Sequence, residues 1–176
     1  ENYAPSSLRT LEKYGNNTFK SIVVCREPIA KWIRWMASAL TFGEIDKAIK
    51  KAGYGELVHL WLFCELNNGV KLIIEKQQTP LITLVKNNKK FKNSMSVSRM
   101  SNITLFDAIK ATKSQLGNRF FRYKSDTDNC QSFADAFLKA NHMMNPTLSS
   151  FVNQNLVNIY HDAKAEILKE TVKLAE

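Results

Sequence analysis

The stretch from Leu57 to Glu75, LVHLWLFCELNNGVKLIIE, decides the fold that we predict for this chain. Two runs rich in branched and aromatic residues flank Asn67-Asn68-Gly69, and an Asn-Gly step between such runs is a strong signal for a β-hairpin. The first run is apolar at nearly every position, which is typical of a central strand covered on both faces. His59 is the conspicuous exception within it. The stretch therefore predicts the centre of a sheet and a candidate functional histidine.

Hydrophobic periodicity and turn residues predict further elements on both sides of the hairpin. These are a strand at 21–25, helices between Pro28 and Gly43 and at 44–52, a third strand at 81–85, a helix at 103–116 capped by Asn102 or Thr104, a short strand at 120–123, a helix from Cys130, and a helical region from Pro146 to Glu176. We predict an α+β fold with an antiparallel sheet, whose central hairpin at 57–76 packs against the Cys130 helix. The predicted divisions are a lead-in segment at 1–20, a domain at 21–145 and an amphipathic helical tail at 146–176.

Composition limits the classes of protein and partner. With 176 residues and a hydrophobic share of 44%, the chain suits one globular core. A net charge of +9 favours contact with phosphates, on nucleic acid or on anionic lipid, although the densest basic run, at 86–92, is typical of a solvated loop. Three cysteines, an odd number, favour a reducing compartment. No run approaches the roughly 18 apolar residues of a membrane span, so we expect no transmembrane segment.

Cys130 is the candidate nucleophile. It follows a cluster of capping residues at 125–129 and shares one helix face with Phe133, Ala134 and Phe137, so its sulfur is expected to face the sheet. A helix N-terminus favours the reactive thiolate over the thiol. The N–H of Cys130 itself is placed to hold the oxyanion formed when a thiolate attacks a carbonyl. Carboxylates at Asp126 and Asp128 would oppose this effect unless they point away.

A thiol nucleophile needs a base, and His59 is the best candidate for it. A third polar group would orient the imidazole. If the hairpin closes around Asn68-Gly69, His59 lies opposite Gln78 or Thr79, with Gln77 and Glu75 further along the second arm. Glu75 has the better chemistry and Gln77 or Gln78 the better reach, so the choice between them stays open.

Each of these residues also has a structural alternative. A lone cysteine at a helix start is more often a packed apolar residue, and a lone histidine in a strand is more often a hydrogen-bonded core group. Cys25 and Cys64 lie in apolar runs and are predicted to pack, whereas His142 and His161 are predicted at the surface. No C-x-x-C or H-x-x-x-H spacing occurs, so we expect neither a metal nor a cofactor.

The order of three motifs resembles that of a known superfamily. They are VHLWLF around His59, the hairpin end IIEKQQ, and Asn129-Cys130-Gln131-Ser132-Phe133 at a helix start. This order is similar to the permuted papain-like superfamily, in its lecithin retinol acyltransferase-like and NlpC-like permuted branches, where histidine precedes cysteine. The likeness covers roughly 22–141 and extends to domains of large DNA viruses and arthropod viruses. The acyltransferase branch has a second histidine in the next strand and Asn-Cys-Glu-His at the nucleophile, whereas this chain has residues 75–78 and Gln131-Ser132 at those places.

The resemblance implies a thiol-dependent acyl hydrolase or acyltransferase, with Cys130 as nucleophile and His59 as base. Its substrate would be an ester or amide, of a lipid or a peptide, and its setting the virion or the host cytoplasm. The alternative is a catalytically inactive interaction module, associated with a capsid or another viral protein, whose basic surface binds nucleic acid or anionic lipid.

Overall fold

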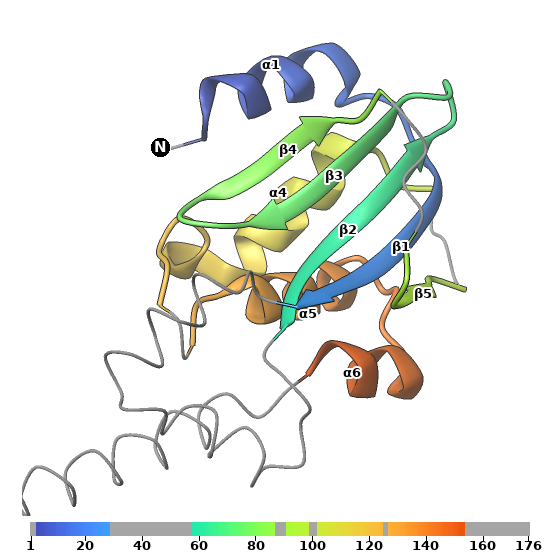
Figure 1. The fold of residues 1–176 in the computed structure, drawn as a ribbon. Coiled ribbons are helices and arrows are strands. Elements are labelled where there is room, and N and C mark those ends of the chain that lie inside the picture. The colour runs from blue at the N-terminus through green and yellow to red at the C-terminus, as the bar shows by residue number, and fades with distance from the viewer. Residues whose placement is uncertain (1–2, 29–57, 87–90, 99–101, 125–126, 154–176) are drawn as a thin grey trace, which may run out of the picture. The chain divides into compact units, whose positions relative to one another are not determined.

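The computed structural model in Figure 1 describes residues 3–28, 58–86, 91–98, 102–124 and 127–153. The chain divides into two compact units, one made of Glu1–Arg26 and Leu60–Asn153 and the other of Glu27–His59 and Gln154–Glu176. Apart from the last residues of β1 and the first two of β2, every element described below belongs to the first unit. The helices predicted between Pro28 and Ala52, and the tail beyond Asn153, lie outside the described residues.

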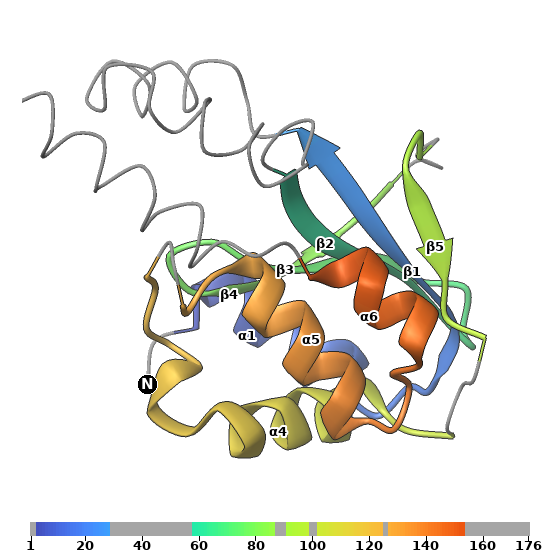
Figure 2. The same cartoon turned by 90° about the horizontal axis from the view of Figure 1, so that it is seen from below.

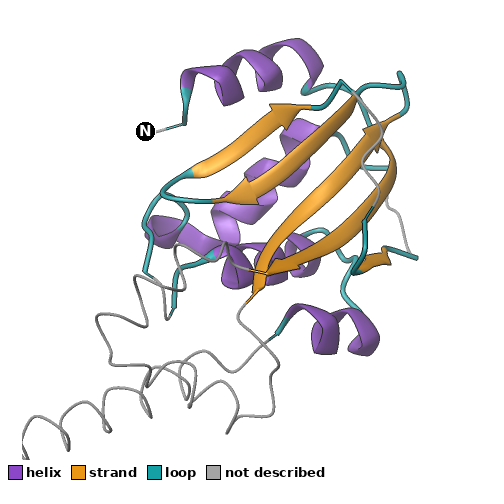
Figure 3. Ribbon diagram, viewed as in Figure 1, coloured by secondary structure: helices purple, strands orange, loops and turns teal. Residues whose placement is uncertain are grey.

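A five-stranded antiparallel sheet forms the centre of the described part of the chain. Its strands are β1 (Phe19–Pro28), β2 (Val58–Leu66), β3 (Lys71–Lys76), β4 (Pro80–Leu84) and β5 (Ser94–Ser96), arranged in the order β4-β3-β2-β1-β5. The predicted hairpin is confirmed as β2 and β3, and Gly69 takes the positive φ of 81° that its turn requires. β2 is the middle strand, as its apolar sequence predicts (Figures 1 and 3).

The two faces of β2 contribute to different hydrophobic clusters. Leu60, Leu62, Cys64 and Leu66 belong to the main core, whereas Trp61 and Phe63 pack with Cys25, Ile73 and Phe91 on the opposite face. This division follows from the alternation of side chains along a strand. The strand is therefore buried on both faces, as expected.

Helices cover the main-core face of the sheet. They are α4 (Leu105–Leu116), α5 (Cys130–Ala140) and α6 (Pro146–Val152), and Figure 2 shows α5 between the other two. The ring of Phe137 on α5 is fully buried and meets Phe19 of β1 edge to face at 6.2 Å. The predicted packing of the hairpin against the Cys130 helix is thus confirmed by the main core, which contains residues of β2, β3 and α5.

The helix α1 (Pro5–Tyr14) lies along the outer side of β4 within the segment predicted as a lead-in (Figure 1). Pro5 stands in its first turn, where a proline costs no hydrogen bond. The buried hydroxyl of Ser7 accepts a hydrogen bond of 3.0 Å from the backbone N–H of Ile82 in β4. α1 therefore satisfies an outward N–H of an edge strand, which would otherwise be open to another chain.

Two further predicted elements are confirmed, and the strand predicted at 120–123 is wrong. β4 and α4 occur as expected, with Thr104 as the N-cap of α4 and Gly117 at its C-terminus. No strand forms at 120–123: Gly117, with a φ of 53°, is the first residue of a short 3-10 helix, η1 (Gly117–Arg119), that precedes this run. Phe120 is then fully buried against Tyr3, Phe121 and Phe133. The aromatic run thus fills the core from a turn rather than from a strand.

Candidate functional site

The N-terminus of α5 is held by a reciprocal pair of caps. Asn129 Oδ1 accepts hydrogen bonds from the N–H groups of Gln131, at 2.9 Å, and Ser132, at 3.1 Å. Ser132 Oγ accepts in turn from the N–H of Asn129, at 2.9 Å. This capping box satisfies donors that a helix start otherwise leaves open. It fixes Cys130 as the first residue of the helix, which confirms the predicted helix start.

Cys130 is buried, with 8% of its surface exposed, and belongs to the main core with Phe133, Ala134 and Phe137. The predicted helix face is therefore the buried one. Because Asn129 engages the N–H groups of Gln131 and Ser132, the N–H of Cys130 itself is the first-turn donor left for an oxyanion.

Asp128 was expected to oppose a thiolate at Cys130 unless its side chain points away. In the structure, Asp128 is buried next to this helix start. Its Oδ2 accepts a hydrogen bond of 2.8 Å from Nε of Arg122, whose side chain is half exposed. Its Oδ1 is buried and has no hydrogen-bond partner among the described residues. Backbone hydrogen bonds in both directions between Lys124 and Asp128 close the turn that leads into α5. The carboxylate is thus fixed beside the helix by both its side chain and its backbone.

Lys76, the last residue of β3, is a buried cation that the sequence analysis missed. Its side chain is 1% exposed, and Nζ donates hydrogen bonds to the carbonyl oxygens of Arg119, at 2.6 Å, and Phe120, at 2.8 Å. Burial lowers the pKa of Lys76 to about 8; the charge of Asp128 raises this pKa, and those of Arg122 and Arg119 lower it further. The alternation of side chains along β3 could have predicted this burial. Leu72 and Ile74 point into the main core, and Lys76 follows them at the same two-residue spacing.

The hairpin register differs from the expected one. Trp61 pairs with Glu75, whereas the expected closure would pair it with Lys76 or Gln77. The same shift moves the expected partner of His59 from Gln78 or Thr79 to Gln77. Nε2 of Gln77, an exposed residue just after β3, donates a hydrogen bond of 3.2 Å to Oε1 of Glu75. These two candidates for the orienting residue are therefore joined to each other.

His59 is the second residue of β2 and is partly buried. It falls in the second compact unit, whereas Cys130 falls in the first. The Cys130–His59 dyad therefore stays a prediction.

The other cysteines and the remaining described histidine add no site. Cys25 and Cys64 are buried in apolar strands, and burial raises the pKa of the Cys64 thiol well above its usual range. His142 follows α5 with an exposed side chain and a φ of 57°. Within the described residues, no three side chains of the His, Cys, Asp or Glu type come together in a group that could hold a metal ion.

The fold and the site define only a broad structural class. The chain is an α+β protein with a five-stranded antiparallel sheet and a cysteine as the first residue of a capped core helix. No family model, no curated protein and no solved structure matches the chain. In the part of the chain that is described, no helix is long and apolar enough to span a bilayer.

Proposed function

We propose that the chain is a thiol-dependent acyl hydrolase or acyltransferase of the permuted papain-like kind, with Cys130 as its nucleophile. The observation that carries the proposal is the placement of Cys130 as the first residue of α5, fixed by the Asn129–Ser132 capping box. A sulfur there meets the positive end of the helix, which stabilises a thiolate. The same position supplies the Cys130 N–H as an oxyanion donor.

In the proposed reaction, the Cys130 thiol gives its proton to the base, for which His59 is the candidate. The thiolate attacks the carbonyl carbon of an ester or amide, a C–S bond forms, and the C–O or C–N bond breaks as the leaving group takes the proton. Water then releases the acid, or an alcohol or amine acceptor takes the acyl group. Glu75 or Gln77 would orient the imidazole.

A second candidate is a catalytically inactive interaction module with a basic surface that binds nucleic acid or anionic lipid. The burial of Cys130 in the main core favours it, because a cysteine that packs as a small apolar residue needs no catalytic role. The net charge of +9 supports the choice of partner. If the module is associated with a capsid, its partner would be another viral protein or the viral genome.

Thiol labelling separates the two candidates. Iodoacetamide alkylation, with each site quantified by peptide mass spectrometry, should modify Cys130 faster at neutral pH than it modifies free glutathione. His59→Ala should slow this alkylation, and His142→Asn, which keeps a residue that tolerates the left-handed backbone, should not. Cys25 and Cys64 serve as buried internal standards.

Ester turnover supplies the second measurement. With 4-nitrophenyl acyl esters, the wild type should release a burst of one nitrophenolate per chain that Cys130→Ser abolishes and Cys25→Ala leaves intact. Alkylation of Cys130 no faster than that of glutathione and unchanged in His59→Ala, together with no burst, would reject the enzyme and leave the interaction module.

A further inference from the structure

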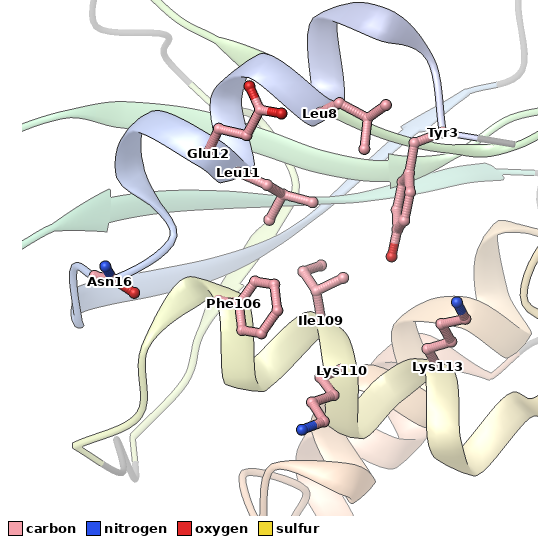
Figure 4. Close-up of a pocket in the computed structure, with 9 residues that line it drawn as sticks. All are labelled: Tyr3, Leu8, Leu11, Glu12, Asn16, Phe106, Ile109, Lys110 and Lys113. Carbon is pink, nitrogen blue, oxygen red and sulfur yellow. The ribbon is translucent and has the colours of Figure 1, made fainter. Parts of the chain in front are cut away.

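A groove between α1 and α4 is a second candidate site, separate from Cys130. Its volume is about 540 Å³, which lies in the range of small-molecule sites. Figure 4 shows its walls, with Leu8 and Leu11 on α1 facing Phe106 and Ile109 on α4. All of these residues belong to one compact unit.

The groove has an apolar floor and an apolar rim. Leu11 and Ile109 form the floor and are buried, with 9% and 2% of their surface exposed. Leu8 and Phe106 form the rim and are, among the residues that the structure describes, two of the few large apolar side chains that remain exposed, at 42% and 52%. An alkyl chain laid in the groove would remove this rim from water, which favours binding in proportion to the apolar area covered.

Charge along the groove is uneven. Lys110 and Lys113 line the groove from α4, and in Figure 4 the ammonium of Lys113 lies toward Tyr3 while that of Lys110 points away from α1. Lys113 Nζ is also 5.2 Å from the ring of Phe121. Glu12 is the one acidic side chain among the described residues of the lining, and its carboxylate points away from α4. The α4 side is therefore positive, which complements an anionic head group at the end of an alkyl chain.

From this geometry we propose that the α1–α4 groove binds a free single-chain carboxylate, of the fatty-acid class, with its alkyl chain on Leu11 and Ile109 and its carboxylate at the Lys113 end of the positive α4 side. A second copy of the chain is disfavoured because each copy carries a net charge of +9. Nucleic acid is disfavoured because the floor is apolar. The proposal does not depend on the reactivity of Cys130.

The test titrates the full chain with dodecanoate below its micelle concentration and follows the methyl signals of Leu8, Leu11 and Ile109 by NMR. We expect saturable shifts confined to the groove, and binding of dodecyltrimethylammonium, which has the same chain and the opposite charge, at least fivefold weaker. Equal binding of both amphiphiles would overturn the proposal. Shifts that depend on protein concentration without ligand, or that need phosphatidylglycerol vesicles rather than dodecanoate, would also overturn it, in favour of a second copy or a membrane surface.

Matched variants locate the two parts of the ligand. Reversing both groove lysines, in Lys110→Glu/Lys113→Glu, should weaken dodecanoate at least about fivefold, since each exposed charge pair contributes up to about 1 kcal/mol. Reversing two exposed lysines outside the groove, in Lys86→Glu/Lys92→Glu, makes the same change in net charge and should weaken it less than twofold. Phe106→Ser should weaken binding, and Leu84→Ser, at an exposed leucine outside the groove, should not. Equal effects within either pair would refute the assigned pose.

Discussion

The buried ammonium of Lys76 makes a testable prediction about stability and pH. In the folded chain the pKa of Lys76 is about 8, and its ordinary value, which applies to the unfolded chain, is 10.5. Between these two values the unfolded chain binds more protons than the folded chain, so the free energy of unfolding rises with pH. Below pH 8 both states are protonated, and the cost of the buried charge is present in full. The difference corresponds to about 3 kcal/mol, at 1.36 kcal/mol for each pH unit.

Urea unfolding of the wild type and Lys76→Met from pH 7 to pH 10 isolates this contribution. The wild type should gain about 2 to 3 kcal/mol relative to Lys76→Met over that range, because a neutral amine still donates to the carbonyls of Arg119 and Phe120. Lys86→Met, which removes an exposed charge, is the matched control. The comparison between variants cancels the titration of groups that all of them share.

Asp128 supplies a second arm of the same experiment. Its charge raises the pKa of Lys76, so Asp128→Asn should move the rise in stability to lower pH. The free energy of unfolding of the wild type, measured relative to Lys76→Met, should therefore rise between pH 8 and 10. If it stays flat or falls over that range, the reasoning is refuted, since the ammonium would then be at least as stable in the folded chain as in water.

Three further changes test the fold around the site. Asn129→Ala removes the acceptor of two first-turn N–H groups and should lower the free energy of unfolding by about 1 to 2 kcal/mol in urea, whereas Asn129→Asp should keep most of it. Phe137→Ala should cost about 3 to 5 kcal/mol, seen as a large fall in Tm, because the ring is fully buried; a loss below 1 kcal/mol would contradict the core described here. Cys64 should escape iodoacetamide in the folded chain, because burial raises the pKa of its thiol, and react at once in denaturant; labelling of the native chain would contradict its placement.

The sheet centre was predictable because its signals are local. An Asn-Gly turn between two apolar runs specifies a hairpin without knowledge of the rest of the chain. The start of α5 was predictable for the same reason, since Asn129 and Ser132 carry their capping contacts within four residues.

The elements that were missed depend on distant partners. β5 is a three-residue strand, Ser94–Ser96, with little apolar signal, and it exists through pairing with Val23–Cys25 of β1. α1 buries Ser7 and Thr10 as well as Leu11, so its inward face does not show as an apolar stripe. The run at 120–123 has the composition of a strand, but packing against Tyr3 and Phe133 prevailed over its β propensity.

The charges near Cys130 bear on which group could activate it. If Lys76 served only to fill space, an apolar residue would do so at lower cost, because a buried charge must be compensated. Lys76 instead satisfies two carbonyl oxygens at η1, and the opposite charge of Asp128 partly compensates its burial. Asp128 is itself paired with Arg122. The carboxylate beside the helix start is therefore engaged by two cations, Lys76 and Arg122. The α5 N-terminus is left as the local feature proposed to activate Cys130, and His59→Ala is the variant that shows whether an imidazole adds to its reactivity.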